Sequence, residues 1–442
     1  MVPDARRAHE PGSERLAGSD CPRRRGDEAR RRDLTHGWRV VAFCFLAAVF
    51  TWGLGVFGAS VYLHEVTKAR GWSISLVSAG ITVFYLTAAL VLPAVGVAID
   101  RRGSRPVIAG GAVLLALGVA AIGHVAAPWH LHAAFVCMGL GYATMSVIGL
   151  SATIAPWFEK YQGRAVAMAL TGASVGAMVV VPLVALSIAR RGFTATTTGA
   201  AAIAAITLVP LALVVLRYRG PADLGLGRDG TTLAEAGPGP LAAAPPAWTR
   251  AQALRSLALW SVAVAFALGL TAQVGFFTHQ VKLAEPVLGA TGAGWLVGVT
   301  GLAGLLGRLL LAWVADRIAL RGYAAAIFAT QALALVLIAI TPGAPVLVGM
   351  TFVYGFCLGQ ITTLSPIIVR REFGAASFGT VYGVAGTVIQ LSSAFGPALY
   401  GIARDLFGSY PPVLAIAAGF ELGALAAVFV GGRSVTRKRN TG

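Results

Sequence analysis

The stretch Gly96-Val-Ala-Ile-Asp100-Arg101-Arg102-Gly103-Ser-Arg105 is a short charged loop between two long apolar runs. A degenerate copy, Ala312-Trp-Val-Ala-Asp316-Arg317, follows another apolar run, and its aspartate lies 216 residues after the first, close to half of the 442-residue chain. A charged loop that recurs at this distance, in the same place after an apolar run, indicates that the chain contains two similar halves.

Apolar runs of about 20 residues recur from Arg39 onward, and each can cross a hydrocarbon core of roughly 30 Å as a helix. Only 12% of the residues are charged, against roughly 25% in soluble domains, which excludes a soluble enzyme. Strict two-residue alternation is absent, so the runs predict helices. We therefore predict an all-α membrane protein with twelve transmembrane helices in two pseudo-symmetric six-helix halves. The predicted spans are 39–63, 74–99, 106–126, 131–155, 164–189, 195–216, 257–280, 292–315, 322–341, 346–369, 377–402 and 411–431.

Two long polar stretches define the expected domain organisation. Residues 1–38 are Arg-rich without a packable apolar pattern, which predicts a disordered cytoplasmic tail. Residues 217–256 are rich in Gly, Pro and Ala, which is typical of a linker. The remaining predicted units are a first half over 39–216, a second half over 257–432 and a basic tail over 433–442.

The distribution of basic residues predicts the orientation in the membrane. If the N-terminus lies inside, 28 Lys and Arg fall on the cytoplasmic side and six on the other. Positively charged loops resist translocation, so we expect both termini in the cytoplasm of a multi-pass protein of the bacterial inner membrane. The net charge of +17 thus records topology, and we expect the lipid bilayer as a partner and no nucleic acid.

The first loop resembles the signature loop of the major facilitator superfamily, Gly-x-x-x-Asp-Arg-x-Gly-x-Arg. This resemblance implies a duplicated transporter whose loops latch the cytoplasmic gate while the molecule faces outward. In the second copy an alanine replaces the first glycine. The expected gating residues are Gly96, Asp100, Arg101, Gly103, Arg105, Asp316 and Arg317.

Further stretches along both halves resemble the monocarboxylate porter branch of this superfamily and the related oxalate/formate antiporters. The resemblance implies transport of a small organic anion without a cofactor or metal, by a protein that functions as a monomer. The matching stretches are Gly71-Trp-Ser73, Gly139-x-Gly141, Pro156-Trp-Phe158, Arg164, His279, Gly307-Arg308, Phe373-Gly374, Phe378-Gly379, Gly396-Pro397 and Asp405-Leu-Phe-Gly-Ser-Tyr410.

Apart from Arg39 and Arg164, which begin their predicted spans, Arg308 is the only Lys or Arg inside a predicted span. A guanidinium there costs at least roughly 2.5–3.5 kcal/mol on insertion scales, so it is expected to face a wet cavity or an anion. Its planar fork suits a carboxylate, and the resemblance implies that it holds the substrate. The alternative is a side chain that snorkels to the interface. Animal members often place an Asp four residues earlier, where this chain has Gly304.

Other polar residues in the spans complete the predicted binding site. Tyr142 and Tyr354 occupy pseudo-equivalent positions in the fourth and tenth spans, where they either close over an anion or pack in the core. Gln390 lies in the span where the oxalate/formate group carries a second cation. No Lys or Arg occurs between Arg371 and Arg404, which favours a substrate with one carboxylate.

Three titratable residues are candidates for proton coupling. His64 occupies a place where animal members of the branch have Lys, and His279 a position that is often His in bacterial members; interfacial histidines are the alternative. Glu421 is the only acid deep in a span, where structural pairing or a neutral acid is the alternative to a transport role.

These patterns predict a secondary transporter that moves a small monocarboxylate with a proton by rocking two halves. The alternatives are an oxalate/formate-type anion antiporter, a drug or metabolite efflux transporter of the same fold, and a non-transporting membrane sensor. An ATP-driven pump is disfavoured because no Gly-x-x-x-x-Gly-Lys-Ser/Thr loop occurs.

Overall fold

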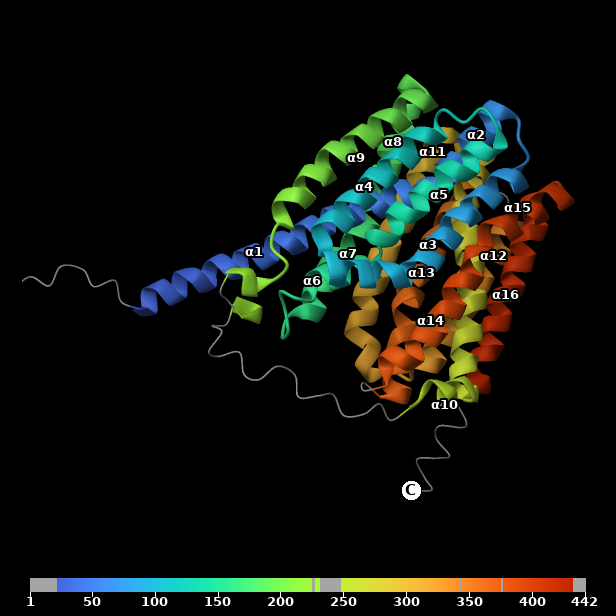
Figure 1. Ribbon diagram of the computed structural model, residues 1–442. Helices are drawn as coiled ribbons and strands as arrows, with labels where there is room; N and C mark the ends of the chain where they lie inside the picture. Colours follow the sequence, from blue (N-terminus) through green and yellow to red (C-terminus); the bar gives the residue numbers. More distant parts are fainter. Residues whose placement is uncertain (1–21, 225–226, 231–247, 342, 375–376, 432–442) are drawn as a thin grey trace, which may run out of the picture.

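The computed structural model describes residues 22–224, 227–230, 248–341, 343–374 and 377–431, and within these ranges every regular element is a helix (Figure 1). The helices of the first half are α1 (Pro22–Phe50), the π-helical segment η1 (Thr51–Val56), α2 (Gly58–Arg70), α3 (Ile74–Arg102), α4 (Ser104–Ile122), α5 (Pro128–Thr144), α6 (Val147–Ile154), α7 (Gln162–Val175), the π-helical segment η2 (Gly176–Val180), α8 (Val181–Arg191) and α9 (Phe193–Val215).

Three short helices follow the first half, and the remaining helices form the second. The short helices are η3 (Pro221–Leu224), η4 (Arg228–Gly230) and α10 (Arg250–Leu254). The second half contains α11 (Leu257–Val314), η5 (Ala315–Arg317), α12 (Leu320–Ile340), α13 (Ala344–Phe373), α14 (Phe378–Ala394), α15 (Gly396–Phe407) and α16 (Tyr410–Val430).

Twelve membrane passes result from these helices, which confirms the predicted fold class. Within the described ranges, ten helical stretches are individually long and apolar enough to cross a membrane. One of them, α11, contains two passes, because Gly289 has a left-handed φ of 69° and interrupts its 58 residues. The remaining pass, the eleventh in chain order, consists of α14 and α15, of 17 and 12 residues, which are separately too short to qualify.

The N-terminal boundary differs from the sequence expectation. Helix α1 begins at Pro22, so residues 22–38 extend the first membrane helix instead of belonging to a tail without structure. The part of the predicted tail before Pro22 and the basic tail after Gly431 lie outside the described residues.

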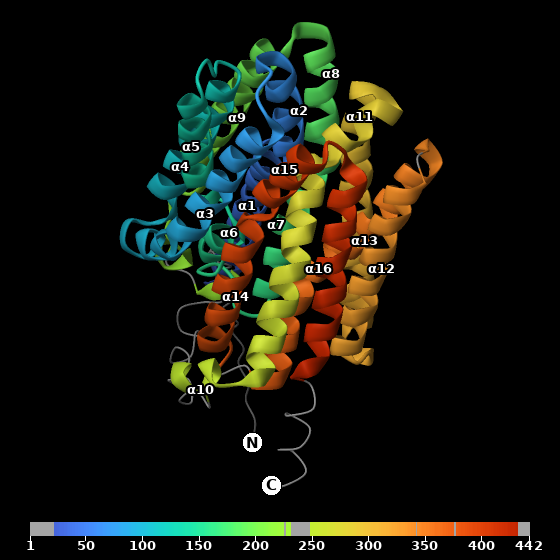
Figure 2. The ribbon, with the colours of Figure 1, turned by 90° about the vertical axis from the view of Figure 1, so that its right-hand side faces the viewer.

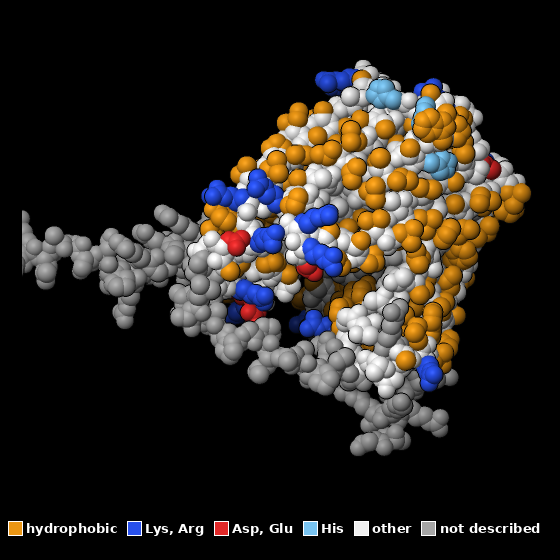
Figure 3. Space-filling model, in the orientation of Figure 1, with side chains coloured by type: hydrophobic (Ala, Val, Ile, Leu, Met, Phe, Trp, Pro, Cys, Tyr) orange, Lys and Arg blue, Asp and Glu red, His pale blue; other side chains and the backbone are white. Residues whose placement is uncertain are grey.

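Large apolar side chains on the outside of the bundle mark the surface that faces lipid (Figure 3). Leu90, Ile206, Ile340 and Leu406 are each between 67% and 75% exposed, although their helices pack into the bundle on the opposite side. In water such a surface would be costly, whereas lipid tails are as apolar as these side chains.

The two ends of the bundle differ in charge and in packing. One end, here called the basic end, carries the loop between α3 and α4 with exposed Arg101, Arg102 and Arg105, and the exposed Lys160 and Arg164 beside it. The other end, here called the closed end, carries the α2–α3, α8–α9 and α15–α16 connections and the bend of α11 (Figure 2), and there hydrogen bonds join the two halves.

Candidate functional site

Arg308 lies on α11 and reaches across to the first half. Its Nη1 donates a hydrogen bond at 3.2 Å to Oγ of Ser174, in the last turn of α7. Ser174 is buried and Arg308 is half-buried. Among the described residues no carboxylate pairs with this guanidinium, so its charge remains available to an anion.

Glycines allow the helices around Arg308 to approach closely. A Cβ added at Gly301 would lie 2.7 Å from Cβ of Ala177 and 2.9 Å from the Ser174 carbonyl oxygen, so α11 rests directly on η2 and the end of α7. A Cβ at Gly307 would lie 2.0 Å from the carbonyl oxygen of Phe356 on α13. These contacts fix the backbone on both sides of Arg308.

The first half presents aromatic residues beside two π-helical segments. Segments η1 and η2 pack together, and a Cβ added at Gly53 would lie 2.7 Å from Cβ of Val180. Trp52 in η1 makes an edge contact with Tyr142, the predicted binding residue, at 5.5 Å between ring centroids. Phe84 lies 5.3 Å from the same ring. Because π-helical turns frequently mark functional sites, this region is a candidate for one.

Tyr354 and Glu421 meet inside the second half. The Tyr354 hydroxyl donates to Oε1 of Glu421 at 3.3 Å, and both side chains are fully buried. The Tyr354 ring also packs on Phe276 at 4.4 Å. Oε2 of Glu421 has no hydrogen-bond partner in the described part of the chain. Two residues that were predicted for different roles therefore form one buried pair.

Gln390 does not join this group. It is exposed on α14, and no described contact connects its side chain to Arg308 or to the tyrosines. Its role remains a prediction from the sequence.

His279 connects four helices at the closed end. Its ring nitrogens lie 3.1 Å from Oγ of Ser78 on α3, 3.1 Å from the carbonyl oxygen of Pro397 on α15 and 3.2 Å from the hydroxyl of Tyr410 on α16. The first of these contacts crosses between the halves, so His279 holds them together at this end.

Two further hydrogen bonds cross between the halves at the closed end. Oδ2 of Asp405 accepts from the backbone N–H of Ser75, in the first turn of α3, at 2.8 Å. A carboxylate at a helix N-terminus is favoured both by the free N–H groups and by the helix dipole. The Ala398 N–H donates to the Thr82 hydroxyl at 3.1 Å.

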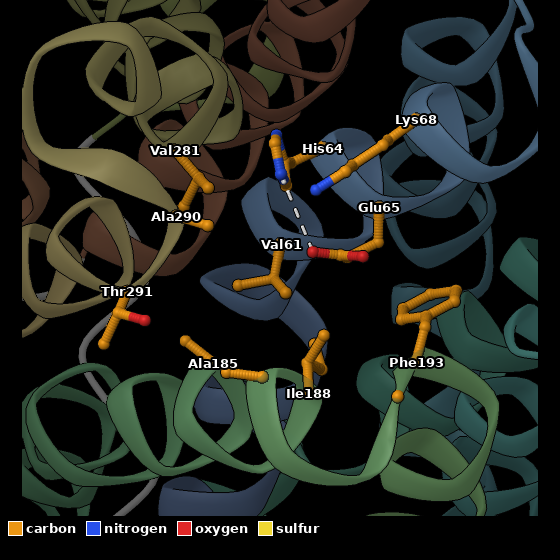
Figure 4. Close-up of a pocket in the computed structure, with 12 residues that line it drawn as sticks. Val61, His64, Glu65, Lys68, Ala185, Ile188, Phe193, Val281, Ala290 and Thr291 are labelled. Atoms are coloured by element: carbon orange, nitrogen blue, oxygen red, sulfur yellow. Dashed lines mark ion pairs between the residues drawn. The ribbon is translucent and has the colours of Figure 1, made fainter.

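His64 lines a pocket of about 230 Å³ between the halves at the closed end (Figure 4). Glu65 and Lys68 on α2, Phe193 on α9 and Thr291 on α11 also line it. His64 itself is buried. The pocket thus brings a histidine, a carboxylate and an ammonium group to the boundary between the two halves.

The residues that the sequence predicts to form the gate lie at the opposite, basic end. Asp100, Arg101 and Arg105 are exposed, and none of them forms an ion pair with another described residue. Gly103 joins α3 to α4 with a φ of +84°. In the second copy Arg317 lies over the Trp313 ring at 5.0 Å, and the side chain of Asp316 lies outside the described residues.

Sequence reasoning missed Arg321, which makes the most extensive polar network in the second half. It lies five residues after Asp316, as Arg105 lies five after Asp100, and this shared spacing was the available signal. Nε and Nη2 donate to the two oxygens of Glu372 at 2.6 and 2.8 Å. Nη1 also donates to Oγ of Ser261 at 2.8 Å, and Nη2 to the Ala258 carbonyl oxygen at 3.1 Å.

Known proteins resemble this chain over most of its length. The chain is 27% identical to monocarboxylate transporter 11 of Homo sapiens, over 85% of this chain and 78% of that protein. It is 26% identical to monocarboxylate transporter 13 of Bos taurus, over 87% of each. A solved structure of the nucleoside transporter NupG has the same fold, with a TM-score of 0.69 and 15% identity over 89% of this chain and 98% of that one.

The family pattern described as "Major Facilitator Superfamily" matches residues 41–397 and 285–441, which together cover most of the twelve-helix bundle. The match agrees with the charged loop after the second pass. It also agrees with the two sets of six passes, which Arg308 connects through its hydrogen bond to Ser174. The chain is therefore a member of the Major Facilitator Superfamily, a secondary transporter of the membrane and not an enzyme.

Proposed function

We propose that this protein transports a small monocarboxylate together with a proton by alternating access. The observation that carries the proposal is the Arg308 guanidinium, which lies within a membrane pass, crosses to the other half and has a serine rather than an acid as its described partner. Two distant relatives are named monocarboxylate transporters, which supports the same substrate class.

In this proposal Arg308 holds the substrate carboxylate, and the rings of Tyr142 and Trp52 cover its apolar part. Tyr354 lies in the second half, where its hydrogen bond to Glu421 holds its ring in place as part of the binding site. Gln390, which is exposed on α14, is proposed as a binding residue from the sequence alone.

Protons are handled by His64 and His279 at the closed end, with Glu421 as a third group deeper in the second half. The two histidines lie where the halves meet, so a change in their protonation alters contacts that must break when this end opens. In this proposal the closed end faces outward. The basic end and both termini face the cytoplasm, as in a protein of the bacterial inner membrane.

The test is substrate binding to the purified protein, measured by quenching of tryptophan fluorescence and by thermal shift. The ligands are formate, acetate, pyruvate, L-lactate, benzoate and oxalate. Arg308→Ala is expected to weaken carboxylate binding by about 2–5 kcal/mol, at least roughly thirtyfold, because a desolvated charge pair loses one partner. Arg164→Ala, which removes an exposed arginine, is the matched control and is expected to bind normally.

Three outcomes would contradict the proposal. Carboxylate binding that survives Arg308→Ala removes the arginine from the site. Competition by cationic or neutral hydrophobic compounds, with no response to the carboxylates, makes the protein an efflux transporter. In proteoliposomes, uptake that ignores a pH gradient and is stimulated by internal anion indicates anion exchange instead.

A further inference from the structure

His64 faces a carboxylate with each of its ring nitrogens. Nδ1 lies 3.2 Å from Oε2 of Glu285 on α11, and Nε2 lies 3.6 Å from Oε1 of Glu65, its neighbour on α2. Only 2% of the His64 side chain is exposed, against 16% for Glu65 and 29% for Glu285. Figure 4 shows His64 and Glu65 turned toward each other at the edge of the pocket.

Protonation of the ring would place a positive charge between the two acids. A neutral imidazole has one donor nitrogen and one acceptor nitrogen, so one of the two carboxylates would face a lone pair. An imidazolium has an N–H on both sides, one toward each acid. Neither His64 nitrogen has a well-aligned hydrogen bond among the described residues, so the two carboxylates are its polar neighbours by proximity.

The pair spans the boundary between the halves. His64 belongs to the first pass of the first half and Glu285 to the first pass of the second, so a movement that separates the halves at this end would break the contact. The charged groups that act on His64 are Glu65 and Lys68 from α2, and Lys282 and Glu285 from α11. When the ring is neutral, the charges of the two acids and the two lysines cancel. Protonation then adds one positive charge between the acids.

We propose that His64 and Glu285 form a proton-dependent clamp between the two halves, with Glu285 as the partner that the coupling histidine needs. Protonation of His64 stabilises the shut state of this end by placing a positive charge between the two carboxylates. When the end opens, the two side chains separate and the proton passes to the solution on that side. This inference rests on the proton-coupled part of the proposed function and adds the residue that converts protonation into movement.

The clamp predicts a conformational response to pH without any substrate. Spin labels at Cys introduced for the exposed Ala69 on α2 and Val287 on α11, with the four native cysteines replaced by Ala, report the separation of the halves in nanodiscs. Between pH 8 and pH 6 the ratio of short to long distances is expected to rise, by at most about tenfold per pH unit for a single proton. His64→Gln and Glu285→Gln are each expected to abolish this rise.

Two further variants complete the experiment. His64→Lys places a permanent cation beside Glu285 and is expected to keep the short distance at both pH values. Asp405→Asn weakens another contact between the halves at the same end, so it lowers the short-distance population at both pH values but leaves its pH dependence intact.

The proposal is overturned if the pH response survives in both Gln variants, or if lowering the pH opens this end. Because no transported compound is present, a failed clamp is distinguishable from a wrong substrate class, which the binding measurements on Arg308 test separately.

Discussion

The two copies of the charged loop have diverged in opposite directions. The first, between α3 and α4, keeps the whole family pattern, and its Asp100 and Arg105 are exposed without ion pairs in the described chain. In the second, between α11 and α12, the first glycine is lost, yet Arg321 is tied to Glu372 through both oxygens. The intact copy is free to engage the other half, whereas the degenerate copy stabilises its own half.

Burial explains this difference. The Arg321 and Glu372 side chains are 12% and 17% exposed, and Arg321 also donates to the carbonyl oxygen of Val428 at the end of α16. A charge in such a place needs its partner, because water cannot replace it. Arg105 remains in water and needs no partner to be stable.

The largest effect is expected when the second copy is broken. Arg321→Ala leaves Glu372 without its bidentate partner and should cost about 3–5 kcal/mol of stability, seen as a clearly lower melting temperature in detergent. Arg105→Ala, its matched counterpart in the first copy, should change stability by no more than about 0.5 kcal/mol. Equal melting temperatures for the two variants would mean that the Arg321 network is not a structural tie.

A smaller effect is expected from the backbone of the first copy. Gly103→Ala forces an L side chain to a φ of +84°, which costs of order 1–3 kcal/mol. Gly322→Ala in the second copy is the control, because Gly322 lies within α12 and has open space where a Cβ would be added. The melting temperature should fall for the first variant and stay level or rise for the second; a fall in both would refute the role of φ.

The smallest effect on stability is expected at Asp100. Asp100→Asn should leave the melting temperature within the range of about 0.5 kcal/mol that is usual for exposed positions. It should nevertheless lower the population in which the basic end is shut, because the carboxylate no longer attracts a cation or helix N-terminus of the other half. Spin labels at Gly163→Cys and Ala319→Cys, one in each half, measure that population, and an unchanged distance distribution would remove Asp100 from the latch.

Much of the fold was predictable because apolar length and loop charge are local properties. The twelve predicted runs each correspond to a helical pass. The pass that is divided into α14 and α15 was also predictable from its apolar composition. The exception is the extension of α1 back to Pro22, where Arg-rich residues without an apolar stripe continue a helix that starts in the membrane. Extending an existing helix by one residue costs less free energy than nucleating a new helix, and the hydrophobic pattern of a sequence does not show this difference.

The candidate site was predictable only where a single residue was conspicuous. Arg308 and Glu421 were evident as charges in apolar spans, and the structure supplies their described partners, Ser174 and Tyr354. Glu285 gave no signal, because an acid near the end of a span is ordinary. Its contact with His64 depends on how the two halves dock, and 221 residues separate the two positions.

The π-helical segment η1 has a consequence for the direction in which the first pass presents its side chains. Each residue of an α-helix turns the chain by about 100°, and a π-helical turn takes up one residue more than an α-helical turn. His64 lies eight residues after Val56, the last residue of η1. Deleting one residue from η1 would therefore turn His64 and Glu65 by about a quarter of a circle, away from Glu285, although His64, Glu65 and Glu285 themselves would all be retained.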